Sequence, residues 1–446
     1  MSGAADTIYA LATGAGRAGV AIIRISGGAA GTALAAVTGR QQWLPRRATR
    51  VRLCDRQGAA LDDALALWFP APASFTGEDV AELHVHGGRA VSGAVLGALA
   101  GVAGLRPAEP GEFSRRAFRN GKLDLTQAEA LADLVAAETA AQHRQALRQL
   151  DGALGGLYEG WRRRLVAAMA LLAAEIDFAD EDDVPSGLHH RVRGEAANLR
   201  REVEAHLADG GRGERIRDGL SVVLAGPPNA GKSSLLNALA GRDAAIVDGS
   251  PGTTRDILEV PMDIGGLPVV LADTAGLRAA VGTVEQEGVR RARQRAAAAD
   301  LRILVLDGAL WPEIDAEARG MLDDDGLIVI NKSDLGRITG DLLMSGRQVL
   351  LVSALLGHGL DALVTEIGVC LNSRFGNDAA PAPTRLLHRR LLEICAAALN
   401  RAERLEESEL LAEELRAAST ALGRIVGQVD VEEVLDVVFR EFCIGK

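Results

Sequence analysis

Apolar residues in the first part of the chain fall in short runs that predict strands. Residues 1–119 contain such runs at Val20–Ile25 and Ala64–Phe69 and an alternation of apolar and polar residues through Val80–His86, separated by Gly and Pro. From 120 to 216 the apolar residues instead recur every three or four positions, which is the spacing of helices. We therefore expect an α+β domain followed by a helical segment.

The middle of the chain alternates strand and helix patterns. Over residues 217–372 this alternation predicts a doubly wound parallel α/β sheet. The expected strands are Ser221–Ala225, Val269–Ala272, Arg302–Leu306, Gly326–Ile330 and Gln348–Val352. A helical pattern returns over 373–446 after a linker, and it can complete the earlier helical block. The fold class we expect is thus multidomain, with an α/β domain inserted into one discontinuous all-α domain.

Residues Gly226–Ser233 match the phosphate-loop pattern G-x-x-x-x-G-K-[ST] at every fixed position. They follow an expected strand and precede an expected helix, Ser234–Ala240, which is the context that such a loop requires. Glycines let backbone N–H groups approach phosphates, and Lys232 reaches the β- and γ-phosphates. A single match of this kind would also fit an ATPase.

Three later motifs favour a guanine nucleotide. They are Gly-Thr-Thr-Arg-Asp at 252–256, Asp-Thr-Ala-Gly at 273–276 and Asn-Lys-Ser-Asp at 331–334. Asp334 can accept from the ring N–H and the exocyclic amine of guanine, a pair of donors that adenine lacks. The hydroxyls of Ser233 and Thr254 suit Mg²⁺, and Asp273 can reach the metal through water. The expected ligand is therefore GTP.

The residue after the Asp-Thr-Ala-Gly motif raises a question about hydrolysis. Many small GTPases place there a Gln that orients the attacking water, whereas this chain has Leu277. The role of that Gln in hydrolysis could instead be filled by Glu285, Arg255, Arg278 or a cation. Asn229 offers a neutral oxygen for a monovalent cation beside the phosphates, where such an ion would spread transition-state charge. Glu285 fits equally a solvated charge at a helix start.

Composition limits the partners. The formal net charge is −11, so no global positive field attracts nucleic acid and any RNA contact must depend on local patches. The four cysteines are far apart, which fits reduced thiols in the cytoplasm. No apolar run approaches the ~18 residues of a spanning helix, so we expect no membrane association.

Lysine is rare in this chain. Of 49 basic residues only four are lysines, Lys122, Lys232, Lys332 and Lys446. Lys232 and Lys332 lie in the nucleotide motifs. Because an ammonium and a guanidinium are not interchangeable at tight sites, we expect the other two to lie in sites that need an ammonium as well.

Two further features allow two interpretations each. His84 and His86 alternate on one strand face, but no acidic or cysteine partner for a metal is evident nearby, so we favour a role without metal. Residues 113–119 gather three arginines and two phenylalanines, Arg115, Arg116, Arg119, Phe113 and Phe118. This segment fits an RNA-binding patch or a solvated helix face.

The chain resembles the MnmE (TrmE) family of tRNA modification GTPases over residues 7 to 446. Besides the GTPase motifs, the resemblance is carried by Gly19–Gly27, Ser74–Asp79, Pro110–Ser114, Asn120–Ala130 and the ending Phe442–Lys446. The Cys-Ile-Gly-Lys ending is the most diagnostic of these. The resemblance implies an N-terminal folate-binding and dimerising domain (1–119), a helical domain in two parts (120–216 and 373–446) and an inserted Ras-like G domain (217–372).

The resemblance also implies an activity. Members hydrolyse GTP with K⁺ stimulation when the two G domains of a homodimer meet. With the FAD-dependent partner MnmG they add an aminomethyl or carboxymethylaminomethyl group to C5 of the tRNA wobble uridine. The one-carbon unit comes from 5,10-methylenetetrahydrofolate or 5-formyltetrahydrofolate. The alternative is a regulatory GTPase switch in ribosome assembly, although the KH-like Gly-x-x-Gly module that would favour it is not apparent.

Family roles transfer where the motifs match. The resemblance implies that K⁺ is bound by Asn229, Thr253 and the carbonyls of Asp248 and Ser250, and that Mg²⁺ is bound by Ser233 and Thr254. Glu285 matches the glutamate that positions water, and Cys443 matches the family cysteine, whose role stays open. The folate-contacting positions are Arg24, Glu82, Lys122 and Lys446.

Motifs and resemblance together define the expected GTP-binding set, in which the guanine edge meets residues 353–355. The set is Asn229, Ala230, Gly231, Lys232, Ser233, Ser234, Asp248, Gly249, Ser250, Pro251, Gly252, Thr253, Thr254, Asp273, Thr274, Ala275, Gly276, Asn331, Lys332, Asp334, Ser353, Ala354 and Leu355. Leu355 stands where a polar residue is common in the family.

Overall fold

The computed structural model describes residues 6–14, 16–177, 187–242, 259–273, 299–313, 320, 325–336, 338, 342–344, 346–376, 380–429 and 445. The chain forms two compact units. The first unit comprises Met1–Ala132, Gln149–Leu199 and Ile394–Lys446, and the second comprises Asp133–Arg148 and Arg200–Glu393.

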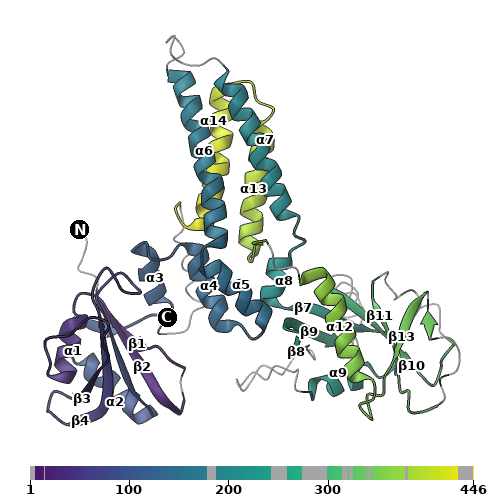
Figure 1. The fold of residues 1–446 in the computed structure, drawn as a ribbon, viewed down its shortest axis with the longest axis horizontal. Coiled ribbons are helices and arrows are strands. Elements are labelled where there is room, and N and C mark those ends of the chain that lie inside the picture. Colours follow the sequence, from purple (N-terminus) through teal and green to yellow (C-terminus); the bar gives the residue numbers. More distant parts are fainter. Residues whose placement is uncertain are drawn as a thin grey trace, which may run out of the picture. The chain divides into compact units, whose positions relative to one another are not determined.

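The first unit contains a six-stranded sheet with the order β3-β4-β5-β2-β1-β6 (Figure 1). Neighbouring strands are antiparallel except β1 and β6, which are parallel. The strands are β1 (Thr7–Leu11), β2 (Ala18–Ser26), β3 (Thr49–Cys54), β4 (Ala60–Phe69), β5 (Val80–Gly87) and β6 (Leu105–Pro107). This is the α+β architecture that the apolar runs predict.

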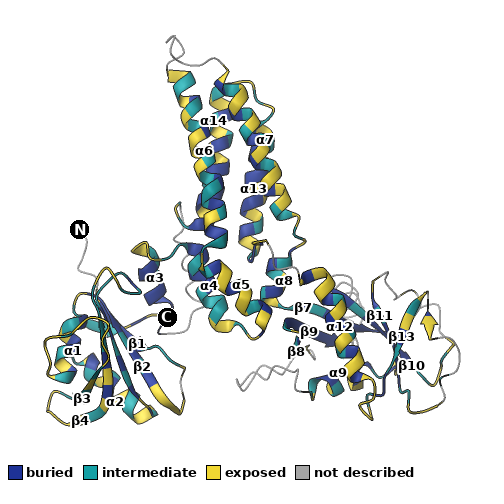
Figure 2. Cartoon of the chain, in the orientation of Figure 1, coloured by how far each residue is buried: buried dark blue, intermediate teal, exposed yellow. Residues whose placement is uncertain are grey.

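Helices cover the two faces of this sheet unequally. On one face α1 (Ala30–Thr38) and α2 (Arg89–Ala100) bury Leu34 and Leu99 against the sheet. On the other face Phe113 of α3 (Glu112–Arg119) packs into a smaller cluster with Ile8 of β1. The remainder of that second face keeps side chains that are partly or fully exposed, including those of Arg24 and Glu82 (Figure 2).

Helices from both ends of the chain pack together in the first unit. These are α6 (Ala153–Asp177) and α14 (Ser408–Val426), which lie side by side (Figure 1). Leucines at helical spacing are buried on each, such as Leu165 on α6 and Leu415 on α14. Three further helices, α4 (Leu125–Ala136), α7 (Leu188–Leu207) and α13 (Leu386–Ala402), continue past the limits of this unit. No helix in the described ranges combines the length and apolar character needed to cross a bilayer.

The second unit contains a seven-stranded sheet with the order β12-β13-β11-β10-β7-β9-β8. The five central strands pair in parallel, and β8 and β12 add antiparallel edges. The strands are β7 (Leu220–Ala225), β8 (Glu259–Ile264), β9 (Leu267–Asp273), β10 (Leu301–Asp307), β11 (Leu327–Asn331), β12 (Leu343–Met344) and β13 (Arg347–Leu351). The doubly wound parallel core predicted for this region is therefore present.

Helices also pack on this second sheet. Leucines of α9 (Lys232–Ala240) and α12 (Leu360–Phe375) join the main apolar cluster with the buried strands β7 and β9. The unit also contains α8 (Arg212–Asp218) and most of α5 (Ala140–Leu150), which continues past the limit of this unit. Because central parallel strands are buried on both faces, their polar residues are confined to the strand ends.

Candidate functional site

Four neighbouring parallel strands end at the same edge of the second sheet, and polar residues or the phosphate loop lie at their ends. The phosphate loop follows β7, and Asp273, Asp307 and Asn331 end β9, β10 and β11. In open α/β sheets ligands bind at the carboxyl edge of the strands. The topology thus brings together three of the sequence motifs and one residue, Asp307, that the motifs do not include.

Backbone geometry fixes the phosphate loop. Gly226 and Gly231 have positive φ angles of 142° and 86°. A Cβ on Gly226 would lie 2.2 Å from the Val305 carbonyl oxygen, and one on Gly231 would lie 2.3 Å from Asn331 Nδ2. Only glycine therefore fits at either position. The loop leads directly into α9, whose first N–H groups form an anion site.

The side chains that would meet phosphate and Mg²⁺ are already oriented. Lys232 is 6% exposed, and its Nζ donates to the carbonyls of Gly226 and Pro227 at 3.0 and 2.8 Å. Ser233 Oγ donates to Asp273 Oδ2 at 2.5 Å. A hydroxyl and a carboxylate so close together are hard oxygen donors of the kind that Mg²⁺ prefers, so these two residues fit the ion.

Asn331 joins the phosphate loop to the loop that follows β13. Its side chain is 1% exposed. Nδ2 donates to the Ala230 carbonyl at 3.1 Å, while Oδ1 accepts from the Ala354 N–H at 3.1 Å. The first residue of the Asn-Lys-Ser-Asp motif thus joins the phosphate loop and the loop after β13 by hydrogen bonds.

Lys332 ties the same motif to Asn229. Its Nζ donates to the Asn229 carbonyl at 2.8 Å and to Asp307 Oδ2 at 2.6 Å. Burial alone would raise the pKa of Asp307, but the hydrogen bonds from Lys332 and the Ala309 N–H, together with the Lys332 charge, outweigh it and lower that pKa. Both Lys332 and Asn229 have positive φ, 62° and 65°. This contact holds the Asn229 turn in a backbone conformation that non-glycine residues seldom adopt.

The carboxylate expected to recognise guanine is also held in place. Ser353, which is fully buried, donates from Oγ to Asp334 Oδ1 at 2.5 Å. The Leu356 N–H in turn donates to Ser353 Oγ at 3.1 Å. Leu355, by contrast, is 82% exposed, so its side chain is not packed against this group.

Many of the expected positions lie outside the described residues. They are Asp248, Gly249, Ser250, Pro251, Gly252, Thr253, Thr254, Arg255, Thr274, Ala275, Gly276, Leu277, Arg278, Glu285, Cys443 and Lys446. Their roles stay predictions.

In the first unit, two of the expected folate-contacting residues form an ion pair. Arg24 donates from Nε to Glu82 Oε1 at 3.0 Å, and its Nη2 lies 2.9 Å from the same oxygen. The guanidinium also lies over the rings of Phe75 and Phe113, 5.3 and 5.7 Å from their centroids. Lys122 makes a separate contact, from Nζ to the Pro72 carbonyl at 3.2 Å.

The end of the chain meets the same sheet. Gly445 has a φ of 106°, and a Cβ there would lie 2.0 Å from the carbonyl oxygen of Leu11. Leu11 is the last residue of β1, and it is paired in register with Ile23 of β2. Ile23 directly precedes Arg24, so Gly445 lies at the end of β1, and the neighbouring strand β2 carries Arg24.

The two histidines of β5 have acidic neighbours, contrary to the sequence-based expectation. His84 Nε2 lies 3.4 Å from Glu82 Oε2, and His86 Nδ1 lies 2.7 Å from Asp62 Oδ1. Asp62 was not evident from the sequence because it reaches β5 across the sheet, from β4, and the role without metal stays a prediction. Each histidine thus contacts a different carboxylate, Glu82 or Asp62. No cluster of three or more metal-binding side chains occurs in the described ranges.

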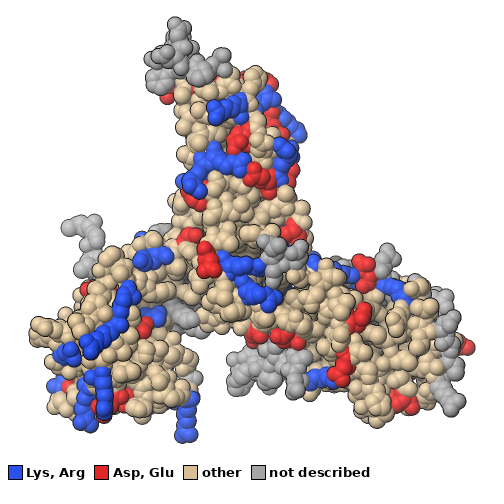
Figure 3. All heavy atoms as spheres, in the orientation of Figure 1, with Lys and Arg blue, Asp and Glu red and all other residues tan. Residues whose placement is uncertain are grey.

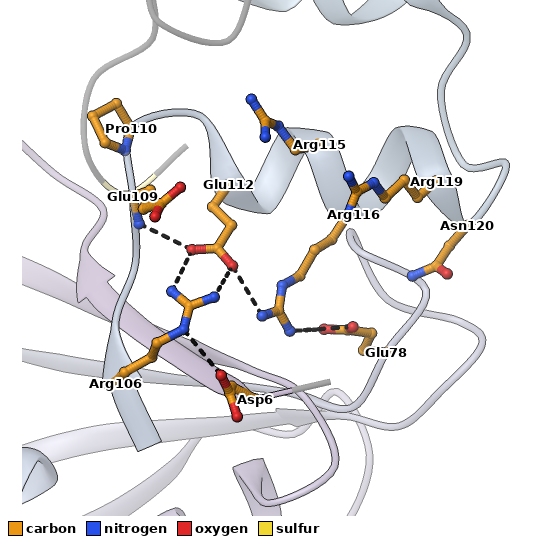
Figure 4. A pocket seen from close by; sticks show the side chains of 10 residues that line it. All are labelled: Asp6, Glu78, Arg106, Glu109, Pro110, Glu112, Arg115, Arg116, Arg119 and Asn120. Atoms are coloured by element: carbon orange, nitrogen blue, oxygen red, sulfur yellow. Dashed lines mark hydrogen bonds and ion pairs between the residues drawn. The ribbon is translucent and has the colours of Figure 1, made fainter. Parts of the chain in front are cut away.

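A cavity of about 390 Å³ lies between α3 and the sheet of the first unit (Figure 4). Its lining residues are Asp6, Glu78, Arg106, Glu109, Pro110, Glu112, Arg115, Arg116, Arg119 and Asn120. Glu112 accepts from Arg106 at 2.6 and 2.8 Å and from Arg116 at 3.0 Å, and Arg116 also pairs with Glu78 at 3.0 Å.

These contacts alter the interpretation of residues 113–119. Phe113 is fully buried and Arg116 is only 9% exposed. Neither can therefore stack on or pair with an RNA at the surface, so the aromatic RNA-binding interpretation of this segment is wrong for these two residues. Arg119 stays exposed.

Replacing Glu112 with Gln should destabilise the protein by about 3 kcal/mol at neutral pH, because it breaks a buried ion pair. Burial would raise the pKa of Glu112, but hydrogen bonds from Arg106, the Glu109 N–H and Arg116 lower it from 4.5 to about 2. Since the folded-state pKa is the lower one, this stabilisation is complete above pH 4.5 and is lost as the pH falls toward 2.

Urea denaturation at several pH values measures the effect. Between pH 4.5 and about 2, the free energy of unfolding of Glu112→Gln should depend less on pH than that of wild type. Glu109→Gln, which changes an exposed side chain, should behave like wild type. Equal free energies of unfolding for wild type and Glu112→Gln would show that the network does not stabilise the fold.

Comparison with known families covers nearly the whole chain. The family model for the N-terminus of the GTP-binding protein TrmE matches residues 7–122, and the MnmE helical domain model matches residues 125–443.

Individual relatives are similar over their full length. The tRNA modification GTPase MnmE of Paramagnetospirillum magneticum is 60% identical over 443 residues, which cover 99% of this chain and 100% of the relative. The tRNA modification GTPase MnmE of Parvibaculum lavamentivorans is 56% identical over 448 residues, with 99% and 100% coverage. Among solved structures, the G domain of the T. maritima FeoB iron transporter is 26% identical over 34% of this chain and 98% of its own, with a TM-score of 0.25.

Proposed function

Because the chain belongs to the MnmE family of tRNA modification GTPases, we propose that it couples GTP hydrolysis to modification of the tRNA wobble uridine. Membership confirms the resemblance seen in the motifs, and it makes the chain a GTPase involved in tRNA modification. The proposed reaction adds a carboxymethylaminomethyl or aminomethyl group to C5 of the uridine. The one-carbon unit comes from a tetrahydrofolate, and the FAD-dependent protein MnmG is the partner.

The proposed domains are 1–119 for folate binding and dimerisation, 120–216 with 373–446 for the helical domain, and 217–372 for the G domain. The packing of α6 on α14 supports a helical domain built from two distant segments, because the whole second sheet lies between them in the sequence. We also propose that the protein is located in the cytoplasm.

For GTP hydrolysis we assign phosphate binding to Lys232 and Mg²⁺ binding to Ser233 and Thr254. When bound, Mg²⁺ neutralises charge on the β- and γ-phosphates. Asn229 is exposed at the surface of the phosphate loop, and Lys332 fixes its backbone carbonyl. Its side chain is thus available for K⁺, helped by Thr253 and the carbonyls of Asp248 and Ser250. Glu285 would orient the water.

One observation carries the folate part of the proposal. Gly445 contacts the end of β1, the strand next to the one that carries Arg24, which supports a folate site at this side of the first sheet. Glu82 can accept from pterin N–H groups, while Lys122 and Lys446 can meet the glutamate tail. Cys443 belongs to the same ending, and we assign it no chemical step.

Reconstitution tests the proposed function. The full chain, MnmG, a tetrahydrofolate, GTP and unmodified tRNA are incubated, and the wobble nucleoside is analysed by mass spectrometry. Modified uridine should form with wild type, should fall at least about tenfold with Glu82→Gln, and should be unaffected in Glu109→Gln. GTP hydrolysis without any modified uridine in wild type would favour the ribosome-assembly switch instead.

A further inference from the structure

Residues 40–56 carry a concentration of arginines that the nucleotide and folate sites do not use. The segment has six arginines and a single acidic residue, Asp55, so its formal charge is +5 in a chain of −11. We call these six arginines the arginine strip: Arg40, Arg46, Arg47, Arg50, Arg52 and Arg56. Figure 3 shows basic side chains gathered over the part of the molecule where Figure 1 labels β3 and β4.

All six arginines of the strip are exposed. Arg40 and Arg46 lie over the rings of Trp43 and Phe69, at 5.3 and 5.6 Å, which orders their guanidinium groups. Asp55 is engaged in its own turn, because its Oδ1 accepts from the N–H groups of Gln57 and Ala59. Within the part of the chain that the structure describes, no ion pair neutralises any member of the strip.

The strip follows an edge of the first sheet. β3 is the terminal strand, and Arg50 and Arg52 extend from the same face of it, about 6.6 Å apart along the strand. This spacing is comparable to that of successive phosphates along an RNA strand. Arg50 is in register with Leu65 of β4, and Leu65 with His84 of β5. Glu82, two residues from His84, therefore lies on the same face of the sheet as Arg50 and Arg52.

We infer that the arginine strip is a docking surface for the phosphate backbone of tRNA. This inference rests on the tRNA-modifying activity of the family and not on the proposed folate chemistry. Exposed guanidinium groups without carboxylate partners are free to form bidentate contacts with phosphate. Because the rest of the chain is net acidic, it repels RNA and directs the backbone to this strip. The shared face places the docked RNA on the side of the sheet that carries Glu82.

Charge reversal at Arg50 and Arg52, which are neighbours on one face of β3, tests whether the arginine strip binds tRNA. Fluorescence anisotropy with labelled tRNA and the full chain gives the dissociation constant over a series of KCl concentrations. Arg50→Glu with Arg52→Glu should weaken binding about tenfold or more, and it should reduce the slope of log K against log salt by about 1.5, since two phosphate contacts are lost. The thermal unfolding of the variant should match that of wild type, which shows that the variant is folded, and GTP hydrolysis without tRNA should be unchanged.

Two control variants separate this surface from general charge effects. Arg163→Glu with Arg416→Glu makes the same charge change at exposed helix positions of the first unit and should leave the salt slope unaltered. Asp63→Asn removes the acidic residue in register with Arg52 and should tighten binding about twofold. An unchanged tRNA affinity in the Arg50 and Arg52 variant, or an equal loss in the helix control, would overturn the inference. Loss of MnmG binding with tRNA affinity intact would assign the strip to a protein partner and would overturn it too.

Discussion

Replacing Lys232 with Ala should lower the GTP hydrolysis rate by about a thousandfold, because it removes the ammonium that the phosphate-loop motif assigns to the β- and γ-phosphates. The Lys232 side chain is buried in the phosphate loop and bonded to two of its carbonyls, so its position is fixed before the nucleotide arrives. Preorganised charge of this kind needs no rearrangement when the transition state forms.

Phosphate release under saturating GTP measures the effect of Lys232→Ala. Lys122→Ala is the matched control, because it removes a lysine from the first unit and should leave the rate unchanged. A Lys232→Ala rate within a factor of about three of wild type would show that the phosphate loop does not act as assigned.

Replacing Asp334 with Asn should lower the affinity for GTP by about a thousandfold and create affinity for xanthosine triphosphate. We propose that Asp334 accepts from guanine N1–H and the exocyclic amine, whereas Asn would present an N–H₂ donor that suits the 2-oxo group of xanthine. Because Ser353 Oγ can donate to the amide oxygen of Asn as well, the residue should keep its orientation.

The xanthosine nucleotide serves as the folding control for this variant. Hydrolysis of GTP and of xanthosine triphosphate is measured side by side over a range of concentrations. Wild type should use GTP only, and the variant should use xanthosine triphosphate at a rate near that of wild type with GTP. Unchanged GTP use by Asp334→Asn would place guanine recognition elsewhere.

The strands of the second sheet were predictable because central parallel strands are continuous apolar runs. The expected strand Arg302–Leu306 differs by one residue at each end from β10, Leu301–Asp307. The edge strand β3 escaped prediction, since Thr-Arg-Val-Arg-Leu-Cys places charged residues between apolar ones and lacks such a run. Missing that strand also hid the arginine strip, which becomes a surface only when β3 is placed at an edge.

The candidate site was predictable where a motif fixes both residue type and spacing. Lys232, Ser233, Asn331 and Asp334 all lie at one sheet edge, as their motifs require. Asp307 was missed, since it belongs to no motif and approaches Lys332 only because β10 and β11 are neighbours in the sheet. The Glu112 network was missed for a similar reason, because Arg106 and Glu78 reach it from β6 and from the segment between β4 and β5.

We propose that a monovalent cation at Asn229 drives GTP hydrolysis, and a comparison of KCl with NaCl at equal ionic strength tests this role. GTP hydrolysis is measured for wild type and Asn229→Ala. K⁺ should stimulate the wild-type rate at least about tenfold over Na⁺, and this stimulation should disappear in Asn229→Ala. Equal wild-type rates in the two salts, or K⁺ stimulation that persists in the variant, would contradict this role.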